Sequence, residues 1–306
     1  MKDRAEEKHP RFSVVIPTYN TTGVLEECIE ALSSQKTDKS FFEVIVVNDG
    51  GSTETYPDIN HADNGLDITY LSQDHKGPAA ARNLGIEKAK GEIILLLDDD
   101  SLPTDNWLDA TIRAWDTSPD FDGIGGYVIS EPTDSIYCRV NADFFNWYLE
   151  QYSSEGRSSF LVTCNAGYRK DALDRIGRFD DRFKRASGED RDLNIKILKC
   201  GGKMRLDRNI LVYHDRDLTF RSFVRKNFNY GKAAYHIYTK YPEQKYLSST
   251  SYVDIYVSII RKYGSLKEKF MAFSLITLSQ AATAVGYYTA LIKKENQTTL
   301  YPQGSN

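Results

Sequence analysis

Three stretches of this 306-residue chain are almost continuously apolar, and helical patterns separate them along the sequence. They are residues 12–17 (FSVVIP), residues 41–49 (FFEVIVVND) and the start of residues 92–100 (EIILLLDDD). Strands without polar alternation have to be covered on both faces, and helices between consecutive strands supply that cover. The chain therefore predicts an α/β fold with a mostly parallel central sheet.

The remaining elements follow from weaker patterns. Further strands are expected at residues 67–72, 122–129 and 160–164, with a hairpin-like stretch over residues 203–214. Helices are expected over residues 22–35, 78–89, 104–117 (with Thr104 as N-cap) and 135–150, and from residue 189 onward.

The charge of the chain divides at residue 215. Residues 1–215 hold 26 lysines and arginines against 38 acidic residues, a charge of −12, whereas residues 216–306 hold 13 against 5, a charge of +8. Eleven of the 20 tyrosines lie in this basic part, and its aromatic residues recur at helical spacing from Phe220 to Tyr238. We predict a flexible N-terminal tail (1–10), an acidic catalytic domain (11–215) and a basic, aromatic C-terminal helical region (216–306).

One segment of the C-terminal region bears on location. Residues 270–292 form an uncharged run of 23 residues, which is long enough to cross a bilayer. Its many small and hydroxylated residues favour a buried or membrane-surface helix instead. The charged N-terminus lacks the apolar run of a signal peptide, so a cytoplasmic location is expected, with peripheral contact to the inner face of a membrane. Packing on the body or a homo-oligomer interface is the alternative role of this region.

Polar residues follow three of the predicted strands at the point where each strand ends. These strand ends read Pro17-Thr18-Tyr19-Asn20, Asn48-Asp49-Gly50-Gly51-Ser52 and Asp98-Asp99-Asp100. Ligands of open α/β sheets bind beyond the carboxyl ends of the strands. The sequence therefore predicts a binding site at this edge of the sheet.

The three consecutive aspartates would repel one another unless a cation or water relieves them. Alternate residues of an extended chain point the same way, so Asp98 and Asp100 are expected to share a face. Paired carboxylates suit Mg²⁺ or Mn²⁺ together with substrate phosphates, and His214 could complete such a site. The alternative is a solvated turn before the next helix.

Two further residues have a binding and a structural interpretation. The Asp49 carboxylate could accept the ring N–H of a uracil-type base, or it could cap its own turn. Arg82 lies on a helix that opens with a glycine turn, an arrangement that suits a pyrophosphate. Its alternative is an ordinary surface arginine.

Glu189 and Asp190 open a helix late in the body. A carboxylate there could act as a general base if burial or its acidic neighbour raises its pKa. Acidic residues also stabilise helix N-termini for structural reasons alone.

Taken in order, these segments resemble glycosyltransferase family 2. The resemblance covers about residues 11–215 and rests on SVVIPTYN, EVIVVNDGGS, KGPAAARNLGI, GEIILLLDDDSLP, CNAGYRKDALDRIGRFDDRF, GEDRDLNIKI and LVYH. It implies a GT-A type nucleotide-binding sandwich with an added C-terminal helical region. It further implies an inverting, metal-dependent transfer from a nucleotide sugar.

The resemblance also implies roles for individual residues. Pro17, Tyr19, Asp49, Arg82, Asp98 and Asp99 would bind the nucleotide sugar, Asp100 and His214 would hold Mg²⁺ or Mn²⁺, Asp190 would be the general base, and Asn165, Arg169 and Glu189 would lie on the acceptor or sugar side. A UDP-sugar is the favoured donor. The acceptor could be a glycan, a lipid-linked molecule or a small molecule, as in cell-surface polysaccharide synthesis.

Other functions fit the chain less well. An NAD-dependent oxidoreductase is disfavoured because Pro17-Thr18-Tyr19-Asn20 stands where GxGxxG would follow the first strand. A nucleic-acid binder is disfavoured by the acidic body. Four cysteines without a CxxC pair argue against a zinc site or a disulfide framework. A non-catalytic sugar-nucleotide sensor or scaffold of the same fold is the alternative that stays open.

Overall fold

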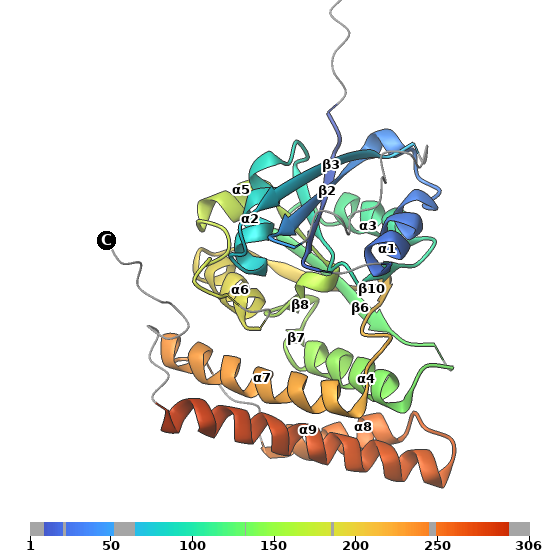
Figure 1. Ribbon diagram of the computed structural model, residues 1–306, viewed down its shortest axis with the longest axis vertical. Coiled ribbons are helices and arrows are strands. Elements are labelled where there is room, and N and C mark those ends of the chain that lie inside the picture. Colours follow the sequence, from blue (N-terminus) through green and yellow to red (C-terminus); the bar gives the residue numbers. More distant parts are fainter. Residues whose placement is uncertain are drawn as a thin grey trace, which may run out of the picture.

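The computed structural model describes residues 9–20, 23–51, 65–131, 133–184, 187–244 and 249–293. Most of the predicted N-terminal tail, residues 1–8, lies outside the described residues. Within them the chain forms an eight-stranded sheet with the order β3-β2-β1-β4-β9-β6-β10-β5, with helices on both faces and a layer of helices at one end (Figure 1).

The strands of the sheet are β1 (Phe12–Thr18), β2 (Phe42–Asp49), β3 (Asp67–Gln73), β4 (Ile93–Leu96), β5 (Leu102–Pro103), β6 (Gly123–Ile129), β9 (Ala166–Arg169) and β10 (Met204–Tyr213), and a small separate hairpin joins β7 (Ser153–Ser154) to β8 (Arg157–Ser158). The helices are α1 (Val24–Ser33), α2 (Pro78–Lys88), α3 (Trp107–Asp116), α4 (Ile136–Gln151), α5 (Lys170–Arg175), α6 (Glu189–Lys199), α7 (Phe220–Lys240), α8 (Ser249–Ile260) and α9 (Leu266–Ile292).

The pairing of the strands confirms a mostly parallel sheet. Strand β1 pairs in parallel with β2 on one side and with β4 on the other. Strand β9 runs antiparallel between β4 and β6, and β10 pairs in parallel with β6. The carboxyl ends of β1, β2, β4 and β10 therefore reach the same edge of the sheet, where the chain order also reverses.

The apolar strands are buried because helices cover both faces. Alternate residues of β1 point to opposite faces: Val14 and Ile16 join a core with α1, α3 and α4, whereas Val15 joins a core with α2 and α6. All seven residues of β1 and all eight of β2 are buried. This double cover is what the unbroken apolar runs predict.

Three predicted elements differ from the structure. Residues 160–164 are not a strand; the strand is β9, which begins two residues later, after a 3-10 turn. Residues 203–214 form one long strand rather than a hairpin, because an irregularity between Leu206 and Leu211 lets both halves pair with β6. Helix α3 starts at Trp107, since the Thr104 N–H bonds to the Leu211 carbonyl of β10.

The C-terminal region is helical, as predicted, and its helices form a layer against α4 (Figure 1). Helices α7 and α9 run side by side, with Tyr235 and Tyr287 in ring contact. Gly231 and Gly286 allow this close approach. A Cβ atom at Gly231 would lie 1.9 Å from the Thr283 carbonyl oxygen, and one at Gly286 would lie 2.0 Å from that of Phe228. Only glycine fits at either position without moving the neighbouring backbone.

Helix α9 is long and apolar enough to cross a membrane, and about a third of its most apolar window is buried. Several large apolar side chains of α9 face outward, among them Phe270 at 71% and Ile292 at 80% exposure. Helix α9 therefore differs from a core helix, which is buried on all sides, and from a single transmembrane helix, which packs on no other part of the protein.

Candidate active site

A cavity of about 1450 Å³ lies between the sheet edge and the C-terminal helices. It is lined by residues that follow β1, β2, β4 and β10, by the start of α6, and by side chains of α4, α7 and α9. Of the residues predicted from the sequence, it brings together Pro17, Tyr19, Asp49, Arg82, Asp98, Asp99, Asp100, Glu189, Asp190 and His214.

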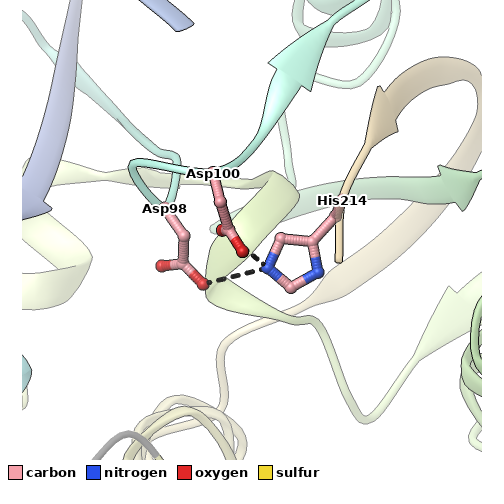
Figure 2. Close-up of side chains that lie close together, drawn as sticks. All are labelled: Asp98, Asp100 and His214. Carbon is pink, nitrogen blue, oxygen red and sulfur yellow. Dashed lines mark ion pairs between the residues drawn. The ribbon is translucent and has the colours of Figure 1, made fainter. Parts of the chain in front are cut away.

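Asp98, Asp100 and His214 form a cluster at one wall of this cavity. Each can offer one ligand atom within 4.8 Å of the others. Figure 2 shows both carboxylates pointing at the same imidazole nitrogen; Nε2 of His214 lies 3.1 Å from Asp100 and 3.6 Å from Asp98. Two carboxylate oxygens and one imidazole nitrogen form a donor set that suits a divalent metal ion.

The predicted reason for this convergence was wrong. Strand β4 ends at Leu96, and the aspartates lie in a turn in which the Ser101 N–H donates to the Asp98 carbonyl at 3.0 Å. The turn, rather than extended alternation, brings Asp98 and Asp100 together.

A second layer of charges holds His214 in place. Its Nδ1 lies 3.1 Å from Asp215, and Asp215 in turn pairs with Lys226 of α7. Burial acts to lower the pKa of His214, but the carboxylates of Asp100 and Asp215 raise it well above its ordinary value. With Nδ1 turned to Asp215, the other ring nitrogen faces the cavity.

Arg82 connects this cluster to the start of α6. Its guanidinium is buried, donates to Asp98 at 2.6 Å and to Glu189 at 2.9 Å, and links two acidic strand and helix ends. Burial acts to raise the pKa of Asp98, but Arg82 and His214 hold it well below its usual range. Arg82 is therefore not a surface arginine, and two of its donor groups are bound to carboxylates.

Asp190 carries the pKa expected of a general base. Burial, followed by the neighbouring Glu189 carboxylate, raises the pKa of Asp190 to about 7. One of its oxygens accepts the Arg191 N–H at 2.7 Å. A carboxylate that titrates near neutral pH in a cavity is suited to accept a proton from a bound hydroxyl.

Asp49 is the last residue of β2 and lines the same cavity. Its oxygens accept bonds from Gln73 (2.7 Å) and from the backbone N–H groups of Lys76 and Gly77 (both 2.8 Å), and it pairs with His75 at 2.9 Å. These donors come from residues 73–77, so the Asp49 carboxylate binds the loop between β3 and α2 rather than capping its own turn. In that turn Asn48 accepts the Gly51 N–H at 2.7 Å. The Tyr19 ring stacks on that of His75 with centroids 4.3 Å apart, and the His75 side chain is about half exposed.

Asn165 and Arg169 do not line the cavity. Asn165 donates to the carbonyls of Tyr127 and Ile210 and accepts from Trp107, and so joins three elements of the core. Arg169 donates to the carbonyls of Phe121 and Pro119. These contacts give both residues a place in the support of the sheet.

Sequence reasoning missed several residues that line the cavity. They are His75, Arg191, Asp215, Lys226, Tyr230 and the aromatic residues of α4. Asp215 follows His214 directly, so a search for carboxylates beside metal-binding histidines could have found it. Lys226 and Tyr230 lie beyond the predicted boundary at residue 215, and that boundary runs through the site.

Comparison with known proteins adds to this geometry. A family model described as "Glycosyl transferase family 2" matches residues 13–177. The chain is 28% identical to a hyaluronan synthase of Pasteurella multocida over 69% of this chain and 25% of that protein. It is also 28% identical to the glycosyltransferase AglE of Haloferax volcanii, over 73% of this chain and 72% of that one. A pre-mycofactocin glycosyltransferase of Mycobacterium tuberculosis is 26% identical, and the matched part spans 49% of its length.

Solved structures show the same fold. A mannosyltransferase from Pyrobaculum calidifontis in complex with GDP-Man and Mn²⁺ superposes with a TM-score of 0.66 and 16% identity, over 94% of this chain and 88% of that one. TarS of Staphylococcus aureus in complex with UDP-GlcNAc superposes with a TM-score of 0.54 and 16% identity, over 93% of this chain and 91% of that one. The predicted GT-A type fold with a C-terminal helical region is confirmed.

Replacing Arg82 with leucine is expected to lower the free energy of unfolding by about 3–5 kcal/mol near pH 7, because Asp98 and Glu189 would lose their shared cation. In the natural protein, the low pKa of Asp98 contributes stability that is present above the unfolded pKa and lost as the pH falls. In the variant Glu189 is buried without a cation and the partly buried Asp98 keeps only His214, so the folded pKa values of both carboxylates rise and the penalty grows with pH.

Urea unfolding at about pH 5 and about pH 8 checks this prediction through the expected pH dependence. The loss of stability should be larger at the higher pH. A matched control is Arg208→Leu, whose pair with Glu150 is exposed and should contribute about 1 kcal/mol or less. An equal loss at both pH values would contradict the assigned role of Arg82.

Proposed function

The chain belongs to glycosyltransferase family 2, and we propose that it transfers a sugar from a UDP-sugar to an acceptor hydroxyl with inversion at the anomeric carbon. The observation that carries this proposal is the arrangement within one cavity of the Asp98/Asp100/His214 cluster and of Asp190, a carboxylate with a pKa of about 7. The cluster suits a diphosphate with its metal ion, and Asp190 suits a general base.

The donor is proposed to lie along the edge of the sheet. Tyr19, with His75 displaced or shared, offers a ring face for the base, and Asp49 stands beside it as an acceptor of a base N–H. Pro17 and Asp99 line the same part of the cavity. Two similar structures carry different nucleotides, UDP-GlcNAc in TarS and GDP-Man in the mannosyltransferase, so the base has to be identified by experiment.

Asp98, Asp100 and His214 would hold Mg²⁺ or Mn²⁺, with Mn²⁺ favoured by the imidazole ligand. The ion would supply positive charge for the diphosphate that leaves. Asp215 keeps Nε2 of His214 turned toward this position, and Arg82 holds Asp98 in place. Metal binding at this site requires a neutral imidazole and therefore releases a proton.

Asp190 would remove the proton from the acceptor hydroxyl as that oxygen attacks the anomeric carbon. The new bond forms on the face opposite the diphosphate, the bond from the anomeric carbon to the phosphate oxygen breaks, and the configuration inverts. Glu189 stays bonded to Arg82 and acts through its charge, which helps to raise the pKa of Asp190.

The names of the relatives give a broad indication of the acceptor. The hyaluronan synthase and TarS, a poly(ribitol-phosphate) β-N-acetylglucosaminyltransferase, act on polymers according to their names. The chain spans only about a quarter of that hyaluronan synthase and about half of the mycofactocin relatives. A role in cell-surface polysaccharide or glycan synthesis, at the cytoplasmic face of a membrane, is proposed on these similarities and on the outward apolar face of α9.

The donor is tested directly by incubating the protein with a panel of UDP-, GDP- and dTDP-sugars and Mn²⁺ and measuring nucleotide release. We expect release from a UDP-sugar above that from GDP-mannose. Release from GDP-mannose alone would overturn the assigned base. Tight binding of a nucleotide sugar without release or transfer would instead support a non-catalytic sensor or scaffold.

Asp190→Asn is expected to lower transfer by about 100-fold or more while leaving nucleotide-sugar binding largely intact. In the unaltered protein, turnover should rise with pH through about 7, because only the ionised Asp190 can accept the proton. The pH profile of kcat and calorimetric donor binding check both statements. Asp171→Asn, at an exposed position of α5, is the matched control, and unchanged turnover in Asp190→Asn would remove the base assignment.

Asp100→Ala is expected to abolish the part of nucleotide binding that depends on the metal. Without Asp100 the cluster keeps one carboxylate and His214, too few ligands to hold the ion well. Calorimetry with UDP in the presence and absence of Mn²⁺ measures this difference. The exposed Asp105→Ala variant should bind as the natural protein does; equal enhancement by Mn²⁺ in both variants would disprove the metal role of Asp100.

Peripheral membrane contact is tested on the full-length chain with anionic liposomes. We expect the protein to pellet with vesicles and a triple variant, Leu266→Ser/Phe270→Ser/Ile292→Ser, to lose most of this binding, because these exposed side chains would enter the interface. Phe41→Ser changes an exposed aromatic residue near β2 and should not alter binding. Absence of pelleting by the natural protein would rule out the membrane role.

A further inference from the structure

Arg191 follows the proposed base directly and brings a positive charge into the aromatic part of the cavity. Its guanidinium donates to the hydroxyl groups of Tyr148 and Tyr152, the second at 3.0 Å. It also lies over two rings, 4.9 Å from the centre of Tyr152 and 5.5 Å from that of Tyr238. These contacts fix the position of the guanidinium at the cavity wall, where both Asp190 and Arg191 are exposed to a ligand.

The Arg191 guanidinium forms no direct ion pair with a neighbouring side chain of the described residues. Within the described part of the chain, no carboxylate lies within ion-pair distance of its guanidinium, and its contacts are phenols and rings. Burial raises the pKa of the Tyr148 hydroxyl well above its ordinary value, so that phenol stays neutral. The Asp190 carboxylate accepts the backbone N–H of Arg191 and lies close enough for the two charges to attract each other, but its side chain makes no direct ion pair with the guanidinium.

Two other cations at the cavity wall, Arg82 and Lys226, differ from Arg191 in this respect. Arg82 is bound by Asp98 and Glu189, and Lys226 is bound by Asp215. A charge that is removed from water is normally paired with an opposite one. The Arg191 guanidinium therefore has no carboxylate in direct contact among the described residues, and a bound anion could supply that contact.

The hydroxyl of Tyr152 is also poised for a ligand. It accepts hydrogen bonds from both Arg191 and Tyr148. A tyrosine hydroxyl has one hydrogen to donate, and among the described residues no acceptor is recorded for that of Tyr152. The guanidinium and this hydroxyl could donate together to one group of oxygen atoms.

The surrounding walls indicate what the rest of the ligand would be. Arg191 lies over the rings of Tyr152 and Tyr238, and Phe160 packs edge-on against Tyr148 and Tyr152. The same cavity is also lined by Phe144, Trp147, Tyr287 and Tyr288. Rings of this kind suit a sugar face or an apolar group. Arg191 brings one positive charge to these rings, so one anionic group is expected beside it.

We propose that Arg191, with Tyr148 and Tyr152, binds an anionic group of the acceptor, a phosphate or a carboxylate, close to the hydroxyl that Asp190 deprotonates. The acceptor is then an organic anion with a sugar ring or an apolar part that contacts the aromatic wall. This inference rests on the proposed glycosyl transfer, since it assigns the acceptor of that reaction.

Three octyl glycosides test the proposal as ligands of the full chain loaded with UDP and Mn²⁺. They are octyl glucoside, which is neutral, octyl glucuronide, which carries a carboxylate, and octyl glucoside 6-phosphate. Calorimetry is expected to show that at least one anionic compound binds about tenfold or more tightly than octyl glucoside, since hydrogen bonds to charged groups are the stronger ones. Which of the two anions binds more tightly identifies the group.

Variants separate the charge of Arg191 from its packing. Arg191→Gln should bring the three affinities to within about twofold of one another, whereas Arg191→Lys should keep part of the preference because it keeps the charge. Arg208→Gln, at an exposed position of β10, is the matched control. If Arg191→Gln does not fold, Tyr152→Phe, which removes only the hydroxyl, should still weaken binding of the anionic ligand.

The outcomes distinguish this inference from the proposed function. If UDP and Mn²⁺ do not bind at all, the proposed function fails. If they bind but the three glycosides bind equally well, or none of them binds, only the anionic acceptor is overturned. A preference for anions that persists in Arg191→Gln would likewise overturn the role of Arg191.

Discussion

The buried guanidinium of Arg82 is the contact on which the rest of the site depends. It lies between Asp98, in the turn after β4, and Glu189, at the start of α6, and donates to both. Without it, the turn that carries the aspartates and the helix that carries Asp190 would present like charges to each other. One cation thus allows the proposed metal site and the proposed base to lie within the same cavity. Burial acts to raise the pKa of Asp98, but Arg82 and His214 hold it low. Burial and the Glu189 carboxylate raise the pKa of Asp190, although Arg82 acts to lower it.

Much of this could be predicted from the sequence because strand-forming runs and the polar residues after them are local signals. The order and type of the first four strands followed from apolar runs, and the strand ends that meet at one edge followed from parallel pairing. The position of β9 could not be predicted in this way. The stretch CNAGYR has small residues at its start, and the pairing that makes it a strand comes from β4 and β6, which are distant in sequence.

The same limit applies to the side chains of the site. Asp49 looked equally suited to a base and to a turn, and only the structure shows four donors around its carboxylate. Arg82 gave no sign of burial, because an arginine after a glycine turn is usually exposed. Lys226 and Tyr230 line the cavity, but they belong to a helix whose sequence pattern predicts only an amphipathic surface. The local sequence does not identify site residues that come from a helix distant in the chain.

Helices α7 and α9 meet at Gly231 and Gly286 with their backbones in direct contact. Sliding or separating the two helices would break this contact, so α7 and α9 form one closely packed pair. On α7, Lys226 and Tyr230 line the cavity. On α9, the side chains of Phe270 and Ile292 are exposed to solvent. One pair of closely packed helices therefore supplies both a wall of the cavity and the exposed apolar side chains of α9.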